Sequence, residues 1–223
     1  MKSARLTPLA LLASAAMLAG VFAIFFVMPD AEPPHGIVYR IIFIHVPSAW
    51  IAYLAFAVVL VGSIAHLRNG SKKMDWLAHA SAEVGVLFTA ICLVTGMVWA
   101  KPLWGAFWVW EPRLTLTFVL LLIYLGYLVF RAMGGDQERT SRIAAVIGIT
   151  GFATIPLIHF AVDWYRGHHP GRAVIRPGGD FQLEPEMVAT LFAMVAVFTV
   201  LYATLLALRI RLAGTAAQLE ALR

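Results

Sequence analysis

The residues best suited to chemistry form one aromatic run between two long apolar stretches. Residues 99–115 hold four tryptophans and a phenylalanine and close on the sequence Glu111-Pro-Arg113. Tryptophan gathers at membrane boundaries because its ring is apolar and its indole N–H needs a polar partner, so an aromatic belt is one interpretation. A shaped platform for a large flat ligand is the other. The residue types alone leave both open.

Histidines flank this run at two distant places in the chain. His45-Val-Pro-Ser-Ala-Trp50 precedes one apolar stretch, and His168 and His169 follow another. An aromatic shelf with an imidazole on each side suits a metalloporphyrin, since porphyrins stack on aromatic rings and imidazole is a common axial ligand of haem iron. The propionates of such a ligand need cationic partners. The candidates for that role are Arg40, Lys101 and Arg113.

The composition indicates an integral membrane protein. Of 223 residues, 61% are hydrophobic and 13% are charged, whereas soluble domains are about 25% charged. The apolar runs are too long and continuous for barrel strands, so we expect an all-α polytopic membrane protein. The single cysteine, Cys92, cannot form an intrachain disulfide. The basic residues are scattered over short loops, which is typical of membrane topology and argues against a nucleic-acid partner.

Six transmembrane helices are expected in a single membrane domain that covers residues 1–223. Hydropathy places them at 9–28, 47–67, 77–98, 114–130, 143–162 and 187–208. The first apolar run is long for a signal peptide and lacks a small-residue cleavage site, so we interpret it as a retained helix. Pro156 should kink the fifth helix. The loops at 99–115 and 163–186 then carry the tryptophan run and the second histidine.

The distribution of charge predicts the orientation. The membrane face that holds both termini and the second and fourth loops carries 11 of the 17 lysines and arginines. By the positive-inside rule both termini are therefore expected to be cytoplasmic. His45, the tryptophan run and His169 are then expected together at the outer face.

Three motifs closely resemble the haem-handling family of cytochrome c maturation protein C (CcmC), which has a tryptophan-rich "WWD" motif. They are His45-Val-Pro-Ser-Ala-Trp50, Val94-Thr-Gly-Met-Val-Trp-Ala-Lys-Pro-Leu-Trp-Gly-Ala-Phe-Trp-Val-Trp-Glu-Pro-Arg-Leu-Thr115 and Ile155-Pro-Leu-Ile-His-Phe-Ala-Val-Asp-Trp-Tyr-Arg-Gly-His-His-Pro170. Their order and the six-helix length also fit that family. The resemblance implies a non-enzymatic protein of the bacterial inner membrane that binds haem b non-covalently and transiently at the periplasmic face.

The resemblance also implies site residues and partners. His45 and His169 match the family's axial ligands of haem iron, with His168 ranked second. The motif that contacts haem is matched by Trp104, Gly105, Trp108, Trp110, Glu111 and Arg113. Glu111 stands where the family usually has Asp. The implied partners are the membrane-anchored haem chaperone CcmE, the subunits CcmA, CcmB and CcmD of an ABC-type complex, and the lipid bilayer. Any ATPase activity would belong to a partner.

Two other functions compete with haem delivery. A permease that conducts haem or another substrate would need polar residues along a midplane path, for which Glu83 and Pro156 are slender support. A di-haem electron carrier would need paired histidines within the membrane, where only His79 and His159 are available. We interpret Glu83 instead as a local pair with His79 on one helix face. The remaining histidines are expected to be interfacial or packed residues: His35, His66, His79 and His159.

Overall fold

The computed structural model describes residues 6–28, 30, 36–134, 136–165, 167–169, 183–220 and 222. This part of the chain is helical, and it contains six helical stretches long and apolar enough to cross a membrane. The all-α, six-span prediction is therefore confirmed. The elements are α1 (Leu6–Phe26), η1 (Ile37–Ile41), α2 (Ile42–Asn69), α3 (Lys72–Trp104), α4 (Pro112–Ala132), α5 (Gln137–Phe152), α6 (Thr154–Trp164) and α7 (Pro185–Glu220).

The fifth span is divided into α5 and α6 at Ala153. Pro156 has no N–H, so it cannot satisfy the carbonyl of Phe152 one turn earlier, and the helix breaks there. The N–H of Ala153 instead bonds the carbonyl of Thr150 at 3.2 Å, in a tighter turn. The predicted kink is confirmed. The predicted boundaries of the spans were less accurate, since α2, α3 and α7 all extend beyond the apolar stretches from which they were predicted.

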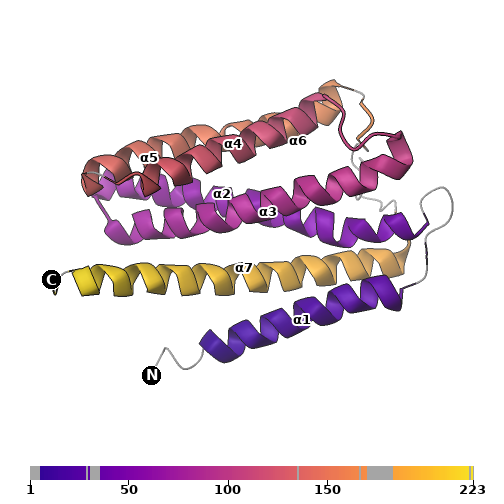
Figure 1. Cartoon of the computed structure of the whole chain (residues 1–223), viewed down its shortest axis with the longest axis horizontal. Coiled ribbons are helices and arrows are strands. Elements are labelled where there is room, and N and C mark those ends of the chain that lie inside the picture. Colours follow the sequence, from indigo (N-terminus) through magenta and orange to yellow (C-terminus); the bar gives the residue numbers. More distant parts are fainter. Residues whose placement is uncertain are drawn as a thin grey trace.

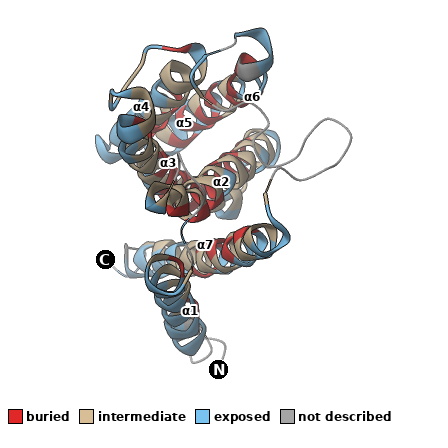
Figure 2. Cartoon of the chain, turned by 90° about the vertical axis from the view of Figure 1, so that its right-hand side faces the viewer, coloured by how far each residue is buried: buried red, intermediate tan, exposed pale blue. Residues whose placement is uncertain are grey.

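The hairpin of α2 and α3 forms the centre of the molecule. Helices α4, α5 and α6 pack on one side of it, and α7 with α1 packs on the other (Figure 1). Viewed from the end of the bundle, α1 and α7 form a separate pair beneath the other helices (Figure 2). Buried residues are concentrated in α2 and α3, as expected of the hairpin that both groups share.

Aromatic rings fill both sides of the central hairpin. On one side Phe56 stacks on Tyr124, with 3.7 Å between the ring centroids and 10° between the planes. Gly85 lies against Phe56, where a Cβ would approach the ring to 2.6 Å. On the other side Phe88 of α3 meets Phe198 of α7, with ring centroids 5.6 Å apart. Flat rings and a glycine let the helices approach one another closely. Close approach increases van der Waals packing, which drives helix association in lipid because the hydrophobic effect does not act between helices there.

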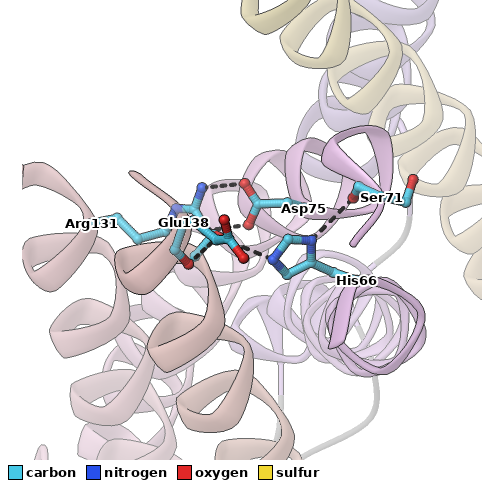
Figure 3. Close-up of polar contacts among 6 residues, drawn as sticks. His66, Ser71, Asp75, Arg131 and Glu138 are labelled. Atoms are coloured by element: carbon cyan, nitrogen blue, oxygen red, sulfur yellow. Dashed lines mark hydrogen bonds and ion pairs between the residues drawn. The ribbon is translucent and has the colours of Figure 1, made fainter. Parts of the chain in front are cut away.

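The end of the bundle where α2 meets α3 is tied by polar side chains (Figure 3). Arg131 of α4 donates two hydrogen bonds to the carboxylate of Asp75 in α3, at 2.5 and 2.8 Å. His66 of α2 contacts the hydroxyl of Ser141 in α5 at 3.0 Å and the carbonyl of Ser71 at 3.1 Å. His66 is therefore a packed structural residue, as predicted. These contacts fix four helices relative to one another.

Glu83 has a partner on another helix besides the one expected. Both of its carboxylate oxygens accept hydrogen bonds from Arg209 of α7. His79 is close enough to Glu83 to interact with it electrostatically, as predicted. The ion pair that Glu83 forms is nevertheless one between helices, with Arg209. Arg209 lies beyond the predicted end of the last span, and the longer α7 carries it alongside α3.

We expect Asp75→Asn to destabilise the protein substantially. The side chains of Asp75 and Arg131 are each 12% exposed, and removing one partner of a buried pair leaves an uncompensated charge that costs about 3–5 kcal/mol. Unfolding in mixed detergent–SDS micelles, followed by tryptophan fluorescence, measures the change. Arg142→Gln is the matched control, because its pair with Glu138 is 60% and 81% exposed. Equal midpoints for the two variants would contradict a structural role for the Asp75 pair.

Candidate functional site

Three segments that are distant in the sequence meet at the end of the bundle opposite the termini. The α3–α4 connection, the start of α2 and the segment after α6 lie at the same end in Figure 1, and the marked N- and C-termini lie at the other. The three elements that carry His45, the tryptophan run and His169 therefore have the relevant ends on one side of the bundle, as predicted from the sequence. Of the predicted loop 163–186, the structure describes residues 163–165, 167–169 and 183–186.

The tryptophan run is a helix end followed by a short connection, rather than a loop throughout. Helix α3 continues to Trp104, and Gly105 ends it in the left-handed conformation with φ of 76°. Its N–H bonds the carbonyl of Lys101 at 3.0 Å. Pro112 then begins α4, a position where the missing N–H costs nothing. The loop predicted at 99–115 is thus shorter, because the residues around Lys101 and Pro102 remain helical.

The tryptophan rings are arranged edge to face. Trp99 and Trp104 have centroids 5.5 Å apart with 86° between their planes, and Trp108 and Trp110 are also 5.5 Å apart. Trp108 is half-buried, and its indole Nε1 is buried without a partner among the described residues. Trp110 is 76% exposed. The run therefore offers an open aromatic surface with an unused N–H donor beside it.

Glu111 joins this run to the second histidine segment. Its carboxylate is 5% exposed, and its Oε2 accepts hydrogen bonds from the backbone N–H groups of His168 at 2.8 Å and His169 at 3.4 Å. The His168 ring lies 5.7 Å from that of Trp104. A small hollow lies at this junction. It is lined by Glu111, Pro112, Arg113, Ala161, Tyr165, Gly167 and His169.

His45 lies inside α2, not just before a helix as the sequence suggested. The 3-10 turn η1 runs directly into α2, so the helix begins at Ile42, ahead of Pro47. The imidazole Nδ1 is 2.9 Å from the carbonyl oxygen of Cys92 and 3.2 Å from the hydroxyl of Thr95. A carbonyl can only accept, so Nδ1 carries the proton and Nε2 presents a lone pair.

The three candidate cations differ in their availability. Arg40 donates to the carbonyls of Phe25 and Met28 at the end of α1 and pairs with Asp30 at 2.7 Å. Lys101 donates to the carbonyl of Gly105 at 2.9 Å and lies over a phenylalanine ring. Both side chains are therefore occupied by the protein's own structure.

Arg113 is the cation that remains. Within the described part of the chain its guanidinium has no hydrogen-bond or ion-pair partner that the geometry defines. It lines the hollow with His169 and is close enough to His45, Tyr53 and Cys92 to interact with them electrostatically. Arg113 thus connects the surroundings of the two histidines.

The residues that hold the His45 ring were not predicted from the sequence. Cys92 acts through its main-chain carbonyl and also through its thiol, whose Sγ lies 3.8 Å from Nδ1 and 4.0 Å from Nε2. Thr95 acts through a hydroxyl that also bonds the carbonyl of Ile91 at 2.7 Å. A Cβ on Gly96 would lie 3.1 Å from the imidazole Cε1, so glycine there gives the ring room. A sequence pattern could reveal the side-chain contacts of this arrangement but not the contact with a main-chain carbonyl.

Comparison with known proteins identifies a family of membrane proteins to which the chain is similar over most of its length. The family model described as "Heme exporter protein C" matches residues 1–222. The chain belongs to the heme exporter protein C (CcmC) family. The CcmC relative of Bradyrhizobium diazoefficiens is 36% identical over 177 residues, which cover 79% of this chain and 66% of the relative.

Two further relatives come from a bacterium and a plant. The heme exporter protein C of Escherichia coli is 34% identical over 181 residues, covering 81% of this chain and 72% of that protein. A ccmC-like mitochondrial protein of cytochrome c biosynthesis from Marchantia polymorpha is 35% identical over 160 residues, covering 72% and 67%. The matched region thus spans about two thirds of the length of these CcmC relatives.

We expect the neutral His45 ring to carry its proton on Nδ1. Nitrogen-15 spectra of histidine-labelled protein in lipid, with the His45→Gln variant to assign the signal, distinguish the two tautomers. Gly96→Ala should shift that signal because its methyl group crowds the ring. Gly126→Ala is the control, since a Cβ there meets nothing within 4 Å. A proton on Nε2 in the ligand-free protein would contradict this geometry.

Proposed function

We propose that this chain binds haem at the periplasmic face of the bacterial inner membrane and delivers it to a membrane-anchored chaperone for the biogenesis of c-type cytochromes. Membership of the CcmC family supports this role. The single structural observation that carries it is that the start of α2, which holds His45, lies at the same end of the bundle as the α3–α4 connection and the segment after α6. Haem is the cargo in this proposal, so no resident cofactor and no catalytic step are required.

The described residues suit a flat, dianionic ligand with a metal centre. The imidazole Nε2 of His45 has a lone pair, as axial ligation of iron requires. The guanidinium of Arg113 supplies the positive charge that propionates need, and the buried Nε1 of Trp108, which has no partner among the described residues, is a further hydrogen-bond donor beside it. Trp104 and Trp110 contribute ring surface, and Gly105 ends α3 so that this surface is presented.

In this proposal His45 and His169 are the two axial ligands of the iron. His45 is held by a helix and by the carbonyl of Cys92, whereas His169 belongs to a segment attached through its backbone. Imidazole ligation lets a protein hold haem without a covalent bond, and the cargo can therefore be passed on.

The orientation and the partners complete the proposal. The excess of lysine and arginine near both termini supports a cytoplasmic location for them, which puts the opposite, histidine-bearing end at the periplasm. The receiving chaperone is CcmE, and the complex includes CcmA, CcmB and CcmD. ATP hydrolysis, where it is needed, is assigned to a partner subunit.

The visible spectrum of the haem-loaded protein tests the axial ligands. His45→Ala and His169→Ala should each weaken or shift the haem signal of protein purified in detergent, because each removes one iron ligand. His159→Ala is the control, since this histidine is exposed on α6 and packs edge-on against Phe160. Adding purified CcmE should then yield a covalent haem adduct with the wild type. Unchanged spectra in both variants would contradict the assigned ligands.

Arg113→Gln should lower haem affinity about 10- to 150-fold, since a hydrogen bond to a charged group contributes roughly 1.5–3 kcal/mol. Spectral titration gives the affinity, and a haem analogue with esterified propionates should largely abolish the difference between variant and wild type. Lys101→Gln is the matched control, because Lys101 is already bonded to Gly105. If Arg113→Gln lowers the affinity for haem and for the esterified analogue by the same factor, the arginine does not act on the propionates.

A further inference from the structure

One oxygen of the Glu111 carboxylate faces the protein backbone. The residue is 5% exposed, and its Oε1 is buried without a partner among the described residues. Its Oε2 accepts hydrogen bonds from the N–H groups of His168 and His169. Gly167 lies directly against the same oxygen, so a Cβ there would collide with it. Three consecutive residues of the second histidine segment therefore touch one carboxylate from the start of α4.

Direct contact with haem is a poor use of this group. A carboxylate only accepts hydrogen bonds, and beside two propionates it would add a third negative charge. Backbone N–H groups are suitable partners because hydrogen bonds to an ionised acceptor are short and strong. Oε2 accepts hydrogen bonds from two such groups, the N–H groups of His168 and His169. The motif's acidic residue is thus engaged with the chain, while Trp108 and Arg113 provide the groups that suit an anion.

We propose that Glu111 is a positioning residue that holds His169 in place for the iron, through the backbone of residues 167–169. This inference rests on the proposed function, in which His169 is an axial ligand. His169 has no helix to fix it, since α6 ends at Trp164. Glu111 anchors its segment to the first residues of α4, beside the hollow that His169 and Arg113 line. The contribution of Glu111 to haem binding therefore passes through His169.

The length of the side chain matters for this contact. Aspartate would withdraw the carboxylate by roughly one C–C bond, about 1.5 Å. The amide N–H of His168 is already at an ordinary hydrogen-bond distance of 2.8 Å from Oε2, so the shorter acid would lose it unless the segment moved. Glutamine keeps an acceptor oxygen at the same reach and removes only the charge.

A double-mutant cycle on the full chain in detergent tests the inference. Haem affinity and visible spectra are measured for the wild type, Glu111→Ala, His169→Ala and the double variant. Glu111→Ala should reproduce the spectrum of His169→Ala and lower affinity about 10- to 100-fold, as loss of a group that orients a metal ligand does. The double variant should be no weaker than His169→Ala alone. A further tenfold loss in the double variant would show that Glu111 acts on haem directly and would overturn the inference.

Two more variants separate positioning from general damage. Glu111→Gln should restore most of the His169-dependent spectrum because its amide oxygen still accepts the N–H groups. Gly167→Ala should mimic Glu111→Ala without altering any charge, since the new methyl group displaces the carboxylate. Gly126→Ala, in open space on α4, should behave as the wild type. A wild-type spectrum for Gly167→Ala would contradict the contact.

Hydrogen–deuterium exchange of the haem-free protein distinguishes failure of the inference from failure of the proposed function. Glu111→Ala should speed exchange of the amides of His168 and His169 relative to Glu111→Gln, with no change near His45. If His169→Ala leaves the haem spectrum intact, the assigned ligand is wrong, whereas accelerated exchange would still establish the Glu111 contact. Unchanged exchange at residues 168 and 169 would refute the positioning role in either case.

Discussion

Hydrogen bonding of the backbone in the membrane is the constraint that shapes this molecule. In hydrocarbon each N–H and C=O must be satisfied within its own helix, so irregular backbone and free donors are confined to helix ends. Side chains then bond the backbone N–H and C=O groups that remain unpaired at the helix ends. Arg40 donates to the carbonyl of Phe25 in the last turn of α1 and to that of Met28 just beyond it. Glu111 accepts from N–H groups beyond the end of α6. A binding site for a polar-edged ligand can form where such ends meet, and here three of them meet at one end of the bundle.

The two ends of the bundle are stabilised in different ways. At the end nearer the termini, Asp75 with Arg131 and His66 with Ser141 connect α2, α3, α4 and α5 through buried polar contacts. At the other end, the Nε1 of Trp108 and the Oε1 of Glu111 are buried without partners among the described residues. Buried polar groups are normally satisfied. The end nearer the termini is therefore held by side-chain contacts between helices, although Ser63 Oγ there also has no partner among the described residues. At the other end the indole N–H of Trp108 is a donor that an anionic ligand suits, whereas the Glu111 carboxylate serves the chain itself.

Hydropathy was enough to predict the six spans, and Pro156 was enough to predict the break between α5 and α6. Helix boundaries were harder, because tertiary packing extends helices past the apolar stretch. Thus His45 belongs to α2, and Trp99 to Trp104 belong to α3. The side chains of the site could be identified from motifs, but the partners of Glu111 and His45 could not. Most of those partners are main-chain groups, the amides of His168 and His169 and the carbonyl of Cys92. Every residue has such groups, so no sequence pattern marks them, and the side-chain partner Thr95 lies on a different helix from His45.

The two histidines are supported with unequal rigidity, and this difference bears on delivery. His45 is fixed by α2 and by the carbonyl of Cys92 on α3, so moving its ring would disturb the central hairpin. His169 lies beyond the end of α6, and its backbone N–H is 3.4 Å from a carboxylate oxygen of Glu111 at the start of α4. In the proposed function, a carrier with two equally rigid ligands would release its cargo slowly, because both iron bonds must break in a fixed frame. A second ligand positioned through a backbone contact would instead let its bond to iron break when that contact is released, while the cargo stays attached to His45 until a partner replaces it.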